Sequence, residues 1–229
     1  MKVFYLQLFL LLYSGFAVAQ PGGSPKYFEG IVEYTINGES YMQGVSNNEI
    51  RERIGATLRL YFKNGNYMRE YVDGAGYTLR KMFYRIDKNL MYDYNPIGSP
   101  DTIYIIDPSE KQYLEYKVSP GKPETVLDYQ CNSSIITAKY YFAPMQDTSE
   151  VRMTYFFAKE LPVNPAWSKN FYIWEEIIKE HKSIAIKFIE EEPLFLKQTY
   201  TATRIQWQPV PDDVFTIDPK LVQVKAPNP

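Results

Sequence analysis

Cysteine and histidine are the side chains with which a search for catalytic chemistry begins, and the chain holds one of each, Cys131 and His181. A thiol nucleophile needs a base within hydrogen-bonding reach, so a Cys-His dyad between these residues is an alternative, although nothing in their spacing recommends it. Cys131 stands in the strand-like run ETVLDYQCNSS, and we expect it to be a small buried side chain on a central strand. We expect His181, at the end of WEEIIKEH, to occupy a surface or helix-cap position, where the helix dipole favours an imidazole.

Carboxylates offer the other candidate chemistry. Asp212 and Asp213 could act as an acid-base pair or hold a cation, but adjacent residues of an extended segment point to opposite faces. Proline followed by acidic residues is also a turn signature, so we predict a turn. The run 190–192 (EEE) is predicted to be the end of a hairpin that its charges keep soluble. A zinc site would need several cysteine or histidine ligands. The sequence therefore predicts no catalytic residue, no metal site and no cofactor, and a protein that is not an enzyme.

The N-terminus MKVFYLQLFLLLYSGFAVAQ has the pattern of a signal peptide: one basic residue, an apolar run, and the small-x-small motif AVA. We expect cleavage between Ala19 and Gln20, which removes the signal peptide 1–19 and leaves a flexible lead-in (20–26) and one domain (27–229). No later apolar run reaches the ~20 residues that span a bilayer. We therefore expect an exported protein with no transmembrane segment in the mature chain, in the periplasm, at the outer surface or outside the cell.

The composition narrows the classes of partner. The formal net charge is −2, and no basic stripe is present to replace phosphate counterions, so nucleic acid is not an expected partner. Hydrophobic residues make up 45% of the chain, enough for a substantial core. Aromatic residues make up 16%, with 21 tyrosines, and such amphipathic rings favour the pleated, half-buried surfaces of sheets.

Alternation of apolar and polar residues predicts a chain made mostly of strands. The clearest region is a three-stranded meander over 57–86, because Asn64-Gly65 tolerates the positive φ of a tight hairpin. The run 73–76 (DGAG) makes the next turn. Further strands are predicted at 27–36, 90–94, 102–106, 111–118, 125–131, 135–142, 151–157, 183–191 and 195–208.

Two helices interrupt these strands. A short helix is capped by Asn47 or Asn48 and runs through Arg53. The second spans 167–180 (WSKNFYIWEEIIKE) and is amphipathic. Its apolar face consists of Phe171, Trp174, Ile177 and Ile178. The predicted fold class is therefore mainly β (α+β), with one or two helices.

Three segments resemble a known group of exported proteins. They are FEGIVEY (28–34), ETVLDYQCNSSIITAKYYF (124–142) and TATRIQWQPVPDDVFTID (201–218). Together they are similar to proteins of Bacteroidetes-type bacteria with a lipoprotein-carrier-like (LolA/LolB-like) fold, including the GLPGLI family. This chain departs from the pattern at Asp128, where glycine is usual, and it has EHKSIAIKF after the helix instead of the GLPGLI string.

The resemblance implies a single curved antiparallel sheet, an open half-barrel that wraps around one or two helices. Carriers of this shape hold acyl chains between sheet and helix. The ligand-binding candidates are therefore aromatic and apolar residues of the predicted helix, namely Phe171, Tyr172, Trp174 and Ile178. The same side chains could instead interdigitate as a dry core.

Two functions follow as alternatives. The first is a non-enzymatic protein of the cell envelope that binds a lipid or another hydrophobic small molecule. The second is a periplasmic or surface interaction module that engages an envelope protein through exposed tyrosines or a free strand edge. A pocket with a mouth would favour the first function, and a filled core with an exposed aromatic patch would favour the second.

Overall fold

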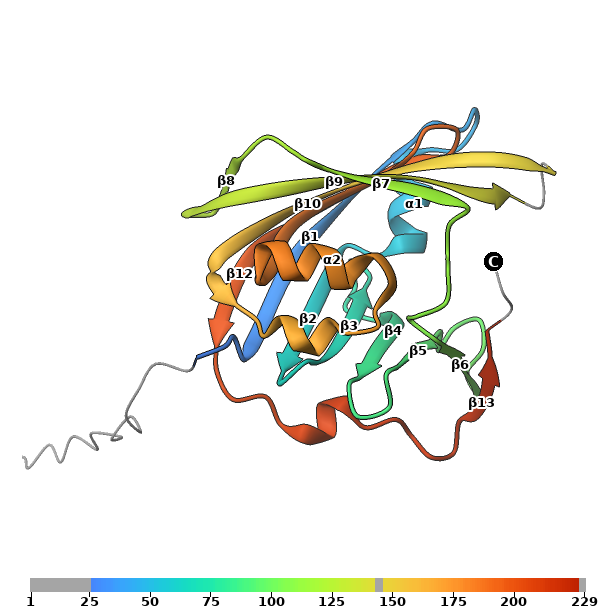
Figure 1. The fold of residues 1–229 in the computed structure, drawn as a ribbon. Coiled ribbons are helices and arrows are strands. Elements are labelled where there is room, and N and C mark those ends of the chain that lie inside the picture. Colours follow the sequence, from blue (N-terminus) through green and yellow to red (C-terminus); the bar gives the residue numbers. More distant parts are fainter. Residues whose placement is uncertain (1–25, 143–145, 227–229) are drawn as a thin grey trace, which may run out of the picture.

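A computed structural model describes residues 26–142 and 146–226, which fold into one strongly curved sheet with two α-helices (Figure 1). The predicted fold class is confirmed, because the chain is mainly β and its open half-barrel curves around a helix. The strand order across the sheet is β13-β6-β5-β4-β3-β2-β1-β12-β11-β10-β9-β7, and β8 pairs with β9. All pairs except β13 with β6 are antiparallel.

The strands are β1 (Gly30–Ser40), β2 (Thr57–Lys63), β3 (Asn66–Val72), β4 (Thr78–Arg85), β5 (Leu90–Tyr94), β6 (Thr102–Ile106), β7 (Glu115–Pro120), β8 (Glu124–Val126), β9 (Tyr129–Phe142), β10 (Asp147–Pro162), β11 (Ser183–Glu192), β12 (Leu196–Trp207) and β13 (Val222–Lys225). The helices are α1 (Asn47–Ile54) and α2 (Tyr172–His181), with the short 3-10 turns η2 (Pro165–Ser168) and η3 (Asp212–Phe215).

The predictions for the N-terminal segment concern residues that the structure does not describe. The predicted signal peptide 1–19, its cleavage site between Ala19 and Gln20, and the lead-in as far as residue 25 lie outside the described residues. The assignment of 27–229 to a single domain stays a prediction. Among the described residues, no helix has the length and apolar character needed to cross a membrane.

The alternation of residues in β1 decides which side chains enter the core. Val32, Tyr34 and Ile36 are buried, whereas Ile31 on the other face is only half-buried. This strand lies between β2 and β12, and its register with β12 shifts between Glu33 and Tyr34. A β-bulge of this kind increases the local twist of a strand, and twist is what allows the sheet to curl.

The predicted hairpin between β2 and β3 is present. Asn64 and Gly65 have φ values of 48° and 83°, the positive values that a two-residue hairpin turn requires. The pairing that follows places Leu60 opposite Arg69 and Phe62 opposite Tyr67. These two pairs become one wall of the pocket described below.

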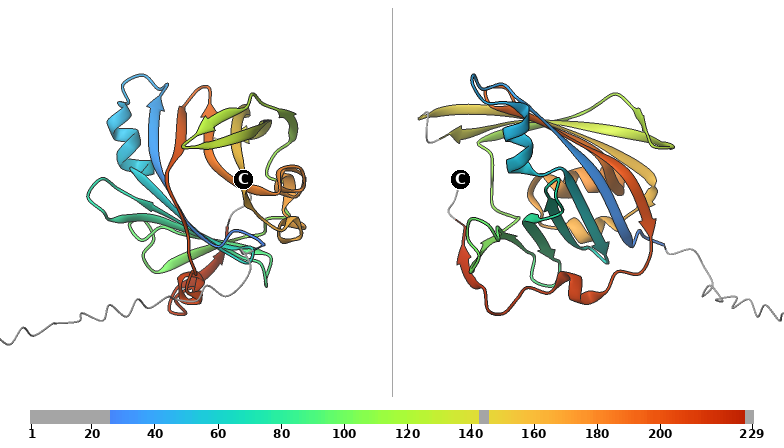
Figure 2. Two further views of the ribbon diagram at one scale, coloured as in Figure 1. Left: turned by 90° about the vertical axis from the view of Figure 1, so that its left-hand side faces the viewer. Right: turned by 180° about the vertical axis from the view of Figure 1, so that it is seen from behind.

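The predicted helix over 167–180 is wrong over its first five residues, 167–171. Pro165 starts a separate 3-10 turn, η2, capped by the Asn164 side chain. Asn170 then adopts a positive φ of 64°, which an α-helix does not accommodate. The α-helix therefore begins only at Tyr172, and η2 and α2 are two separate short elements that lie side by side (Figures 1 and 2).

The cap predicted for the first helix is also wrong. Ser46, not Asn47 or Asn48, caps α1, and it does so in a capping box with Glu49. The Ser46 hydroxyl accepts from the Glu49 backbone N–H at 3.2 Å, and the Glu49 carboxylate accepts from the Ser46 N–H at 2.7 Å. A serine three residues before a glutamate carries this signal.

The strands predicted at 111–118 and 125–131, and the central position predicted for Cys131, need correction. The strand expected at 125–131 is divided by a tight turn, because Leu127 has a φ of 52°, so that β8 folds back on the start of β9. Cys131 is buried as expected, but β9 lies next to the edge strand β7 and is not central. The strand expected at 111–118 is β7 and begins only at Glu115.

The concave and convex faces of the sheet bury different side chains. The main core fills the concave side, where Ile173 and Ile177 of α2 pack on the sheet. Figure 2 (left) shows α2 inside the curl of the strands. A smaller cluster on the convex side joins Met68 and Phe83 to Phe215 of η3. The C-terminal segment thus covers β3–β6 from outside before β13 adds to β6 in parallel, a pairing that the sequence pattern did not indicate.

Candidate functional site

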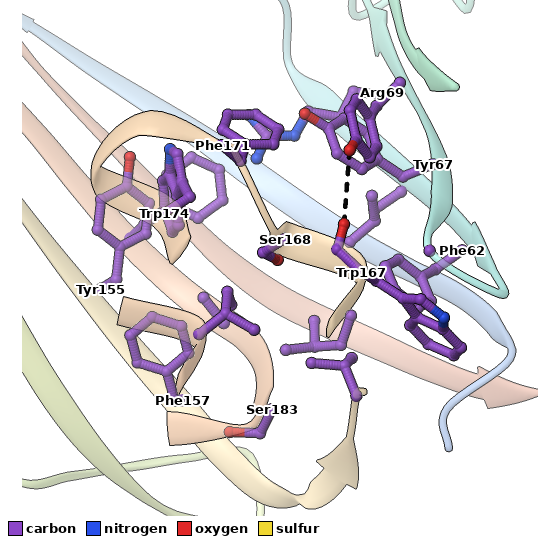
Figure 3. A pocket seen from close by; sticks show the side chains of 18 of the residues that line it. Phe62, Tyr67, Arg69, Tyr155, Phe157, Trp167, Ser168, Phe171, Trp174 and Ser183 are labelled. Atoms are coloured by element: carbon purple, nitrogen blue, oxygen red, sulfur yellow. Dashed lines mark hydrogen bonds between the residues drawn. The ribbon is translucent and has the colours of Figure 1, made fainter. Parts of the chain in front are cut away.

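A pocket of about 190 Å³ lies between the concave face of the sheet and the segment formed by η2 and α2 (Figure 3). Strands β2, β3, β10 and β11 form one side, and η2 with α2 forms the other. The lining consists chiefly of large apolar and aromatic side chains. The central ones are Leu60, Phe62, Tyr67, Tyr155, Phe157, Trp167, Phe171, Trp174, Ile178 and Phe188.

Three of the four predicted ligand-binding residues line this pocket: Phe171, Trp174 and Ile178. The fourth, Tyr172, does not. Its ring meets Tyr116 edge-on with centroids 5.4 Å apart, and its hydroxyl donates to the Tyr113 carbonyl oxygen at 3.5 Å. The helical period explains this division, because residues 171, 174 and 178 share one face of a helix while residue 172 is turned about 100° from residue 171.

The aromatic side chains around the pocket support one another. Tyr155 meets Trp174 edge-on at 4.6 Å between centroids and lies nearly parallel to Phe188 at 5.5 Å. On the opposite side, Trp167 packs against Phe62 at 5.9 Å. Pairs of this geometry contribute about 0.5–1.5 kcal/mol beyond the burial of their area, so the walls are held in place without a ligand.

Most hydroxyl groups at the pocket already have partners. Tyr34 donates to the Ala185 carbonyl oxygen at 2.7 Å, and Tyr155 donates to the Glu190 carboxylate at 3.1 Å. Tyr84 donates to Asn89 at 3.0 Å and to the Trp167 carbonyl at 3.4 Å, the bond dashed in Figure 3. Burial raises the pKa of the Tyr155 hydroxyl well above its ordinary value, so this group stays protonated and remains a donor.

Arg69 is the one charged side chain among the residues that line the pocket. Arg69 was not among the predicted binding residues, although the sequence contains a signal for it. In NYMREYV, Arg69 occupies the same set of alternating positions as Tyr67 and Tyr71, the set that faces the core. An arginine among core-facing positions is the feature that would have identified it.

A second cavity of about 810 Å³ adjoins the first, and Gln112 lines both. It lies between the ends of β9–β12 and the segment that follows β6, and its lining is more polar. Tyr113, Tyr140 and Met153 contribute to it, as do Glu190 and Glu192. The run 190–192 is therefore more than the soluble hairpin end that was predicted. It includes Glu190, whose pKa is raised by burial on the concave face while nearby Arg69 opposes that rise.

The expectation for His181 is also wrong in part. Its ring is half-buried and stacks on Phe157, and its Nε2 atom lies 2.7 Å from the Ser134 Oγ. The partner of the imidazole is thus Ser134 and not Cys131. A serine paired with a histidine suggests nucleophilic catalysis, but Ser134 has an exposed fraction of 0%. A substrate does not reach it, so the bond is a structural contact between α2 and β9.

Cys131 has the environment of an inert core residue. Its exposed fraction is 1%, and burial raises the pKa of the thiol to about 11. The acidic pair behaves as a turn: Asp212 starts η3, and its carboxylate lies 2.8 Å from the Lys63 ammonium. Neither feature forms a reactive centre with the pocket.

The chain is similar to a solved structure but to no protein family or curated protein. No protein-family model matches the chain, and no curated protein matches it. Among solved structures, the chain is similar to the Mycobacterium tuberculosis lipoprotein LppX, with 6% sequence identity over 80% of this chain and 89% of that chain and a TM-score of 0.34. The fold and the pocket define the class of protein: a curved sheet with an internal apolar pocket.

Proposed function

We propose that this is an exported, non-enzymatic protein of the cell envelope that binds a lipid or another hydrophobic ligand between its sheet and α2. The observation that carries the proposal is the pocket itself, a space walled by aromatic and aliphatic side chains on both sides. Ligand sites are typically apolar, with few polar groups that fix orientation. A dry, fully interdigitated core would leave no such space.

The size of the space also bears on the ligand. Pockets for small molecules measure about 300–1,000 Å³, and the pocket at Trp174 is smaller, at about 190 Å³. The adjoining cavity reaches about 810 Å³. In this proposal the apolar pocket holds one end of an elongated ligand, and the remainder extends past Gln112 into the wider cavity.

The proposal also includes export of the protein and its membership of a protein family. The signal-peptide pattern over 1–19 supports delivery to the periplasm, the outer surface or the medium. The segments 28–34, 124–142 and 201–218 support a place among the lipoprotein-carrier-like proteins, the group that includes the GLPGLI family. Binding of hydrophobic molecules in the cell envelope agrees with both.

Native mass spectrometry of the mature chain, purified from a bacterial periplasm without detergent, tests the proposal. We expect a lipid-sized adduct that disappears after solvent extraction and refolding. Trp174→Ala and Tyr172→Ala form a matched pair on one helix, because only Trp174 lines the pocket. Loss of the adduct in the Trp174 variant alone would support the site, and a ligand-free spectrum from the unextracted protein would count against it.

A protein-interaction role is the second candidate. Edge strand β7 has one free side. Leu114, just before the strand, and Tyr116 within it are exposed at 65% and 40%. The same strand carries Glu115, Lys117 and Pro120, however, and charges and proline are the features by which natural edge strands resist strand addition. The pocket is therefore the better-supported site.

A further inference from the structure

The apolar pocket contains one cation, and the fold determines its position. β3 projects Arg69 onto the concave face, opposite Leu60 of β2 and Met82 of β4. Each of these cross-strand neighbours is apolar, and Arg69 is the one charged residue in the lining. In Figure 3 its side chain and that of Tyr67 lie at the same end of the pocket.

The other basic side chains of this region are paired, whereas Arg69 is not. Arg59 lies 3.4 Å and Lys81 lies 3.5 Å from the Glu70 carboxylate, and Arg80 lies 2.6 Å from that of Asp93. Among the described residues, no carboxylate comes within 4.0 Å of the Arg69 guanidinium and no acceptor makes a hydrogen bond to it.

The contacts that Arg69 does make are aromatic. Its guanidinium carbon lies 5.4 Å from the ring centroid of Tyr67 and 5.9 Å from that of Phe188. Cation–π attraction offsets part of the cost of removing the charge from water. It satisfies none of the five N–H donors of the guanidinium, which are left to a partner that enters the pocket.

The Tyr67 hydroxyl adds a second donor at this end. It makes no hydrogen bond to another described residue, unlike the hydroxyls of Tyr34, Tyr84 and Tyr155. Burial raises the pKa of Tyr67 to about 12, so the hydroxyl keeps its proton. An arginine fork beside a free hydroxyl suits a planar or tetrahedral group of anionic oxygens.

We propose that the ligand is an amphiphile with an anionic oxygen group, a carboxylate or a phosphate, which Arg69 binds while the apolar chain lies along the aromatic walls of the pocket. This inference rests on the proposed function, because it names the chemical class of the hydrophobic ligand. It adds a recognition residue and a charge preference to a site that would otherwise select only for apolar surface.

Glu190 is the carboxylate that could compete for Arg69. The hydroxyl of Tyr155 donates to it at 3.1 Å, and its distance from Arg69 exceeds that of an ion pair. Its negative charge still lowers the positive potential at the guanidinium. Glu190→Gln removes that charge and should therefore strengthen the binding of an anion. Substitution of Arg69 should have the opposite effect and weaken it.

Calorimetric titration with four ligands of one chain length tests the inference: decanoate, decyl phosphate, decanol and decylamine. We expect the wild type to bind one or both anions at least about 10-fold more tightly than decanol, because hydrogen bonds to charged groups have this strength. Arg69→Met should weaken anion binding about 10- to 100-fold and leave decanol unchanged. Arg80→Met is the matched control, since Arg80 is paired with Asp93 and does not line the pocket.

The possible results separate the two proposals. Tighter binding of decanoate assigns a carboxylate, and tighter binding of decyl phosphate assigns a phosphate. Equal binding of anions and decanol by the wild type overturns the inference but leaves hydrophobic binding intact. No binding of any ligand overturns both proposals. If Arg69→Met does not fold, Glu190→Gln decides the matter, because unchanged or weaker anion binding in that variant contradicts a site at Arg69.

Discussion

The imidazole of His181 lies flat against the ring of Phe157, with centroids 4.0 Å apart and an interplanar angle of 11°. This contact joins the last residue of α2 to β10, and the bond between His181 and Ser134 joins the same residue to β9. The helix that covers the pocket is therefore fastened at its C-terminal end by a titratable group. Burial of the ring lowers its pKa below the ordinary value, although Glu180 opposes the shift.

This contact predicts a loss of stability in acid. The unfolded chain binds a proton on His181 near its ordinary pKa of about 6.5, and the folded chain binds it only at lower pH. Stability due to this residue is therefore complete above about pH 6.5 and falls as the pH drops through the folded pKa. Urea unfolding at several pH values measures it. In His181→Phe, which keeps a ring on Phe157, this part of the pH dependence should vanish.

The same variant should also be less stable at neutral pH, by about 1–3 kcal/mol, because the buried Ser134 hydroxyl loses its partner. Parallel pH profiles for the two proteins would contradict the account of His181. The comparison isolates this residue because the chain has no other histidine.

Cys131 should not react while the protein is folded. Raising the thiol pKa from 9.0 to about 11 lowers the thiolate fraction about 100-fold near neutral pH, and burial blocks access as well. A chromogenic disulfide reagent should therefore label the native protein very slowly and the denatured protein to one thiol per chain. Rapid stoichiometric labelling of the native protein would show that the site is open.

The packing of Trp167 in the pocket wall should depend on the absence of a side chain at Gly65. A Cβ at this position would lie 2.7 Å from both the Trp167 Cγ and the Ile86 Cδ1, and the φ of 83° strains any other residue. Gly65→Ala should therefore cost about 1–3 kcal/mol in the free energy of unfolding and shift the tryptophan emission. Gly76→Ala is the matched control, because its φ of 94° imposes similar backbone strain while a Cβ there meets nothing within 4 Å, so it should cost less stability and leave the tryptophan emission unchanged. Equal effects of the two substitutions would argue against the packing at Trp167.

Local patterns in the sequence predict much of this fold. Asn64-Gly65 marks the hairpin, the alternation over 27–36 predicts the first strand, and the spacing of Phe171 and Trp174 identifies the helix face that meets the pocket. These signals lie within a few residues of one another. They depend on backbone preferences and on the periods of helix and strand.

The features that were missed depend on contacts between distant segments. Ser134 and His181 are 47 residues apart, and β13 pairs with β6 across most of the C-terminal half of the chain. The isolation of Arg69 arises only when β2, β4 and α2 surround it. No local sequence pattern indicates that an arginine will have no carboxylate partner in the folded protein.

Quenching of tryptophan emission by a dibrominated fatty acid gives the sharpest test of a ligand site between the sheet and α2, because bromine quenches only at close range. Trp167 and Trp174 line the pocket, whereas Trp207 packs on Phe28 at 42% exposure outside it. In Trp207→Phe, we expect saturable quenching of the two remaining tryptophans. In the double variant Trp167→Phe/Trp174→Phe, we expect the Trp207 emission to be unchanged. Quenching of Trp207 alone, or of neither set, would contradict a ligand site between the sheet and α2.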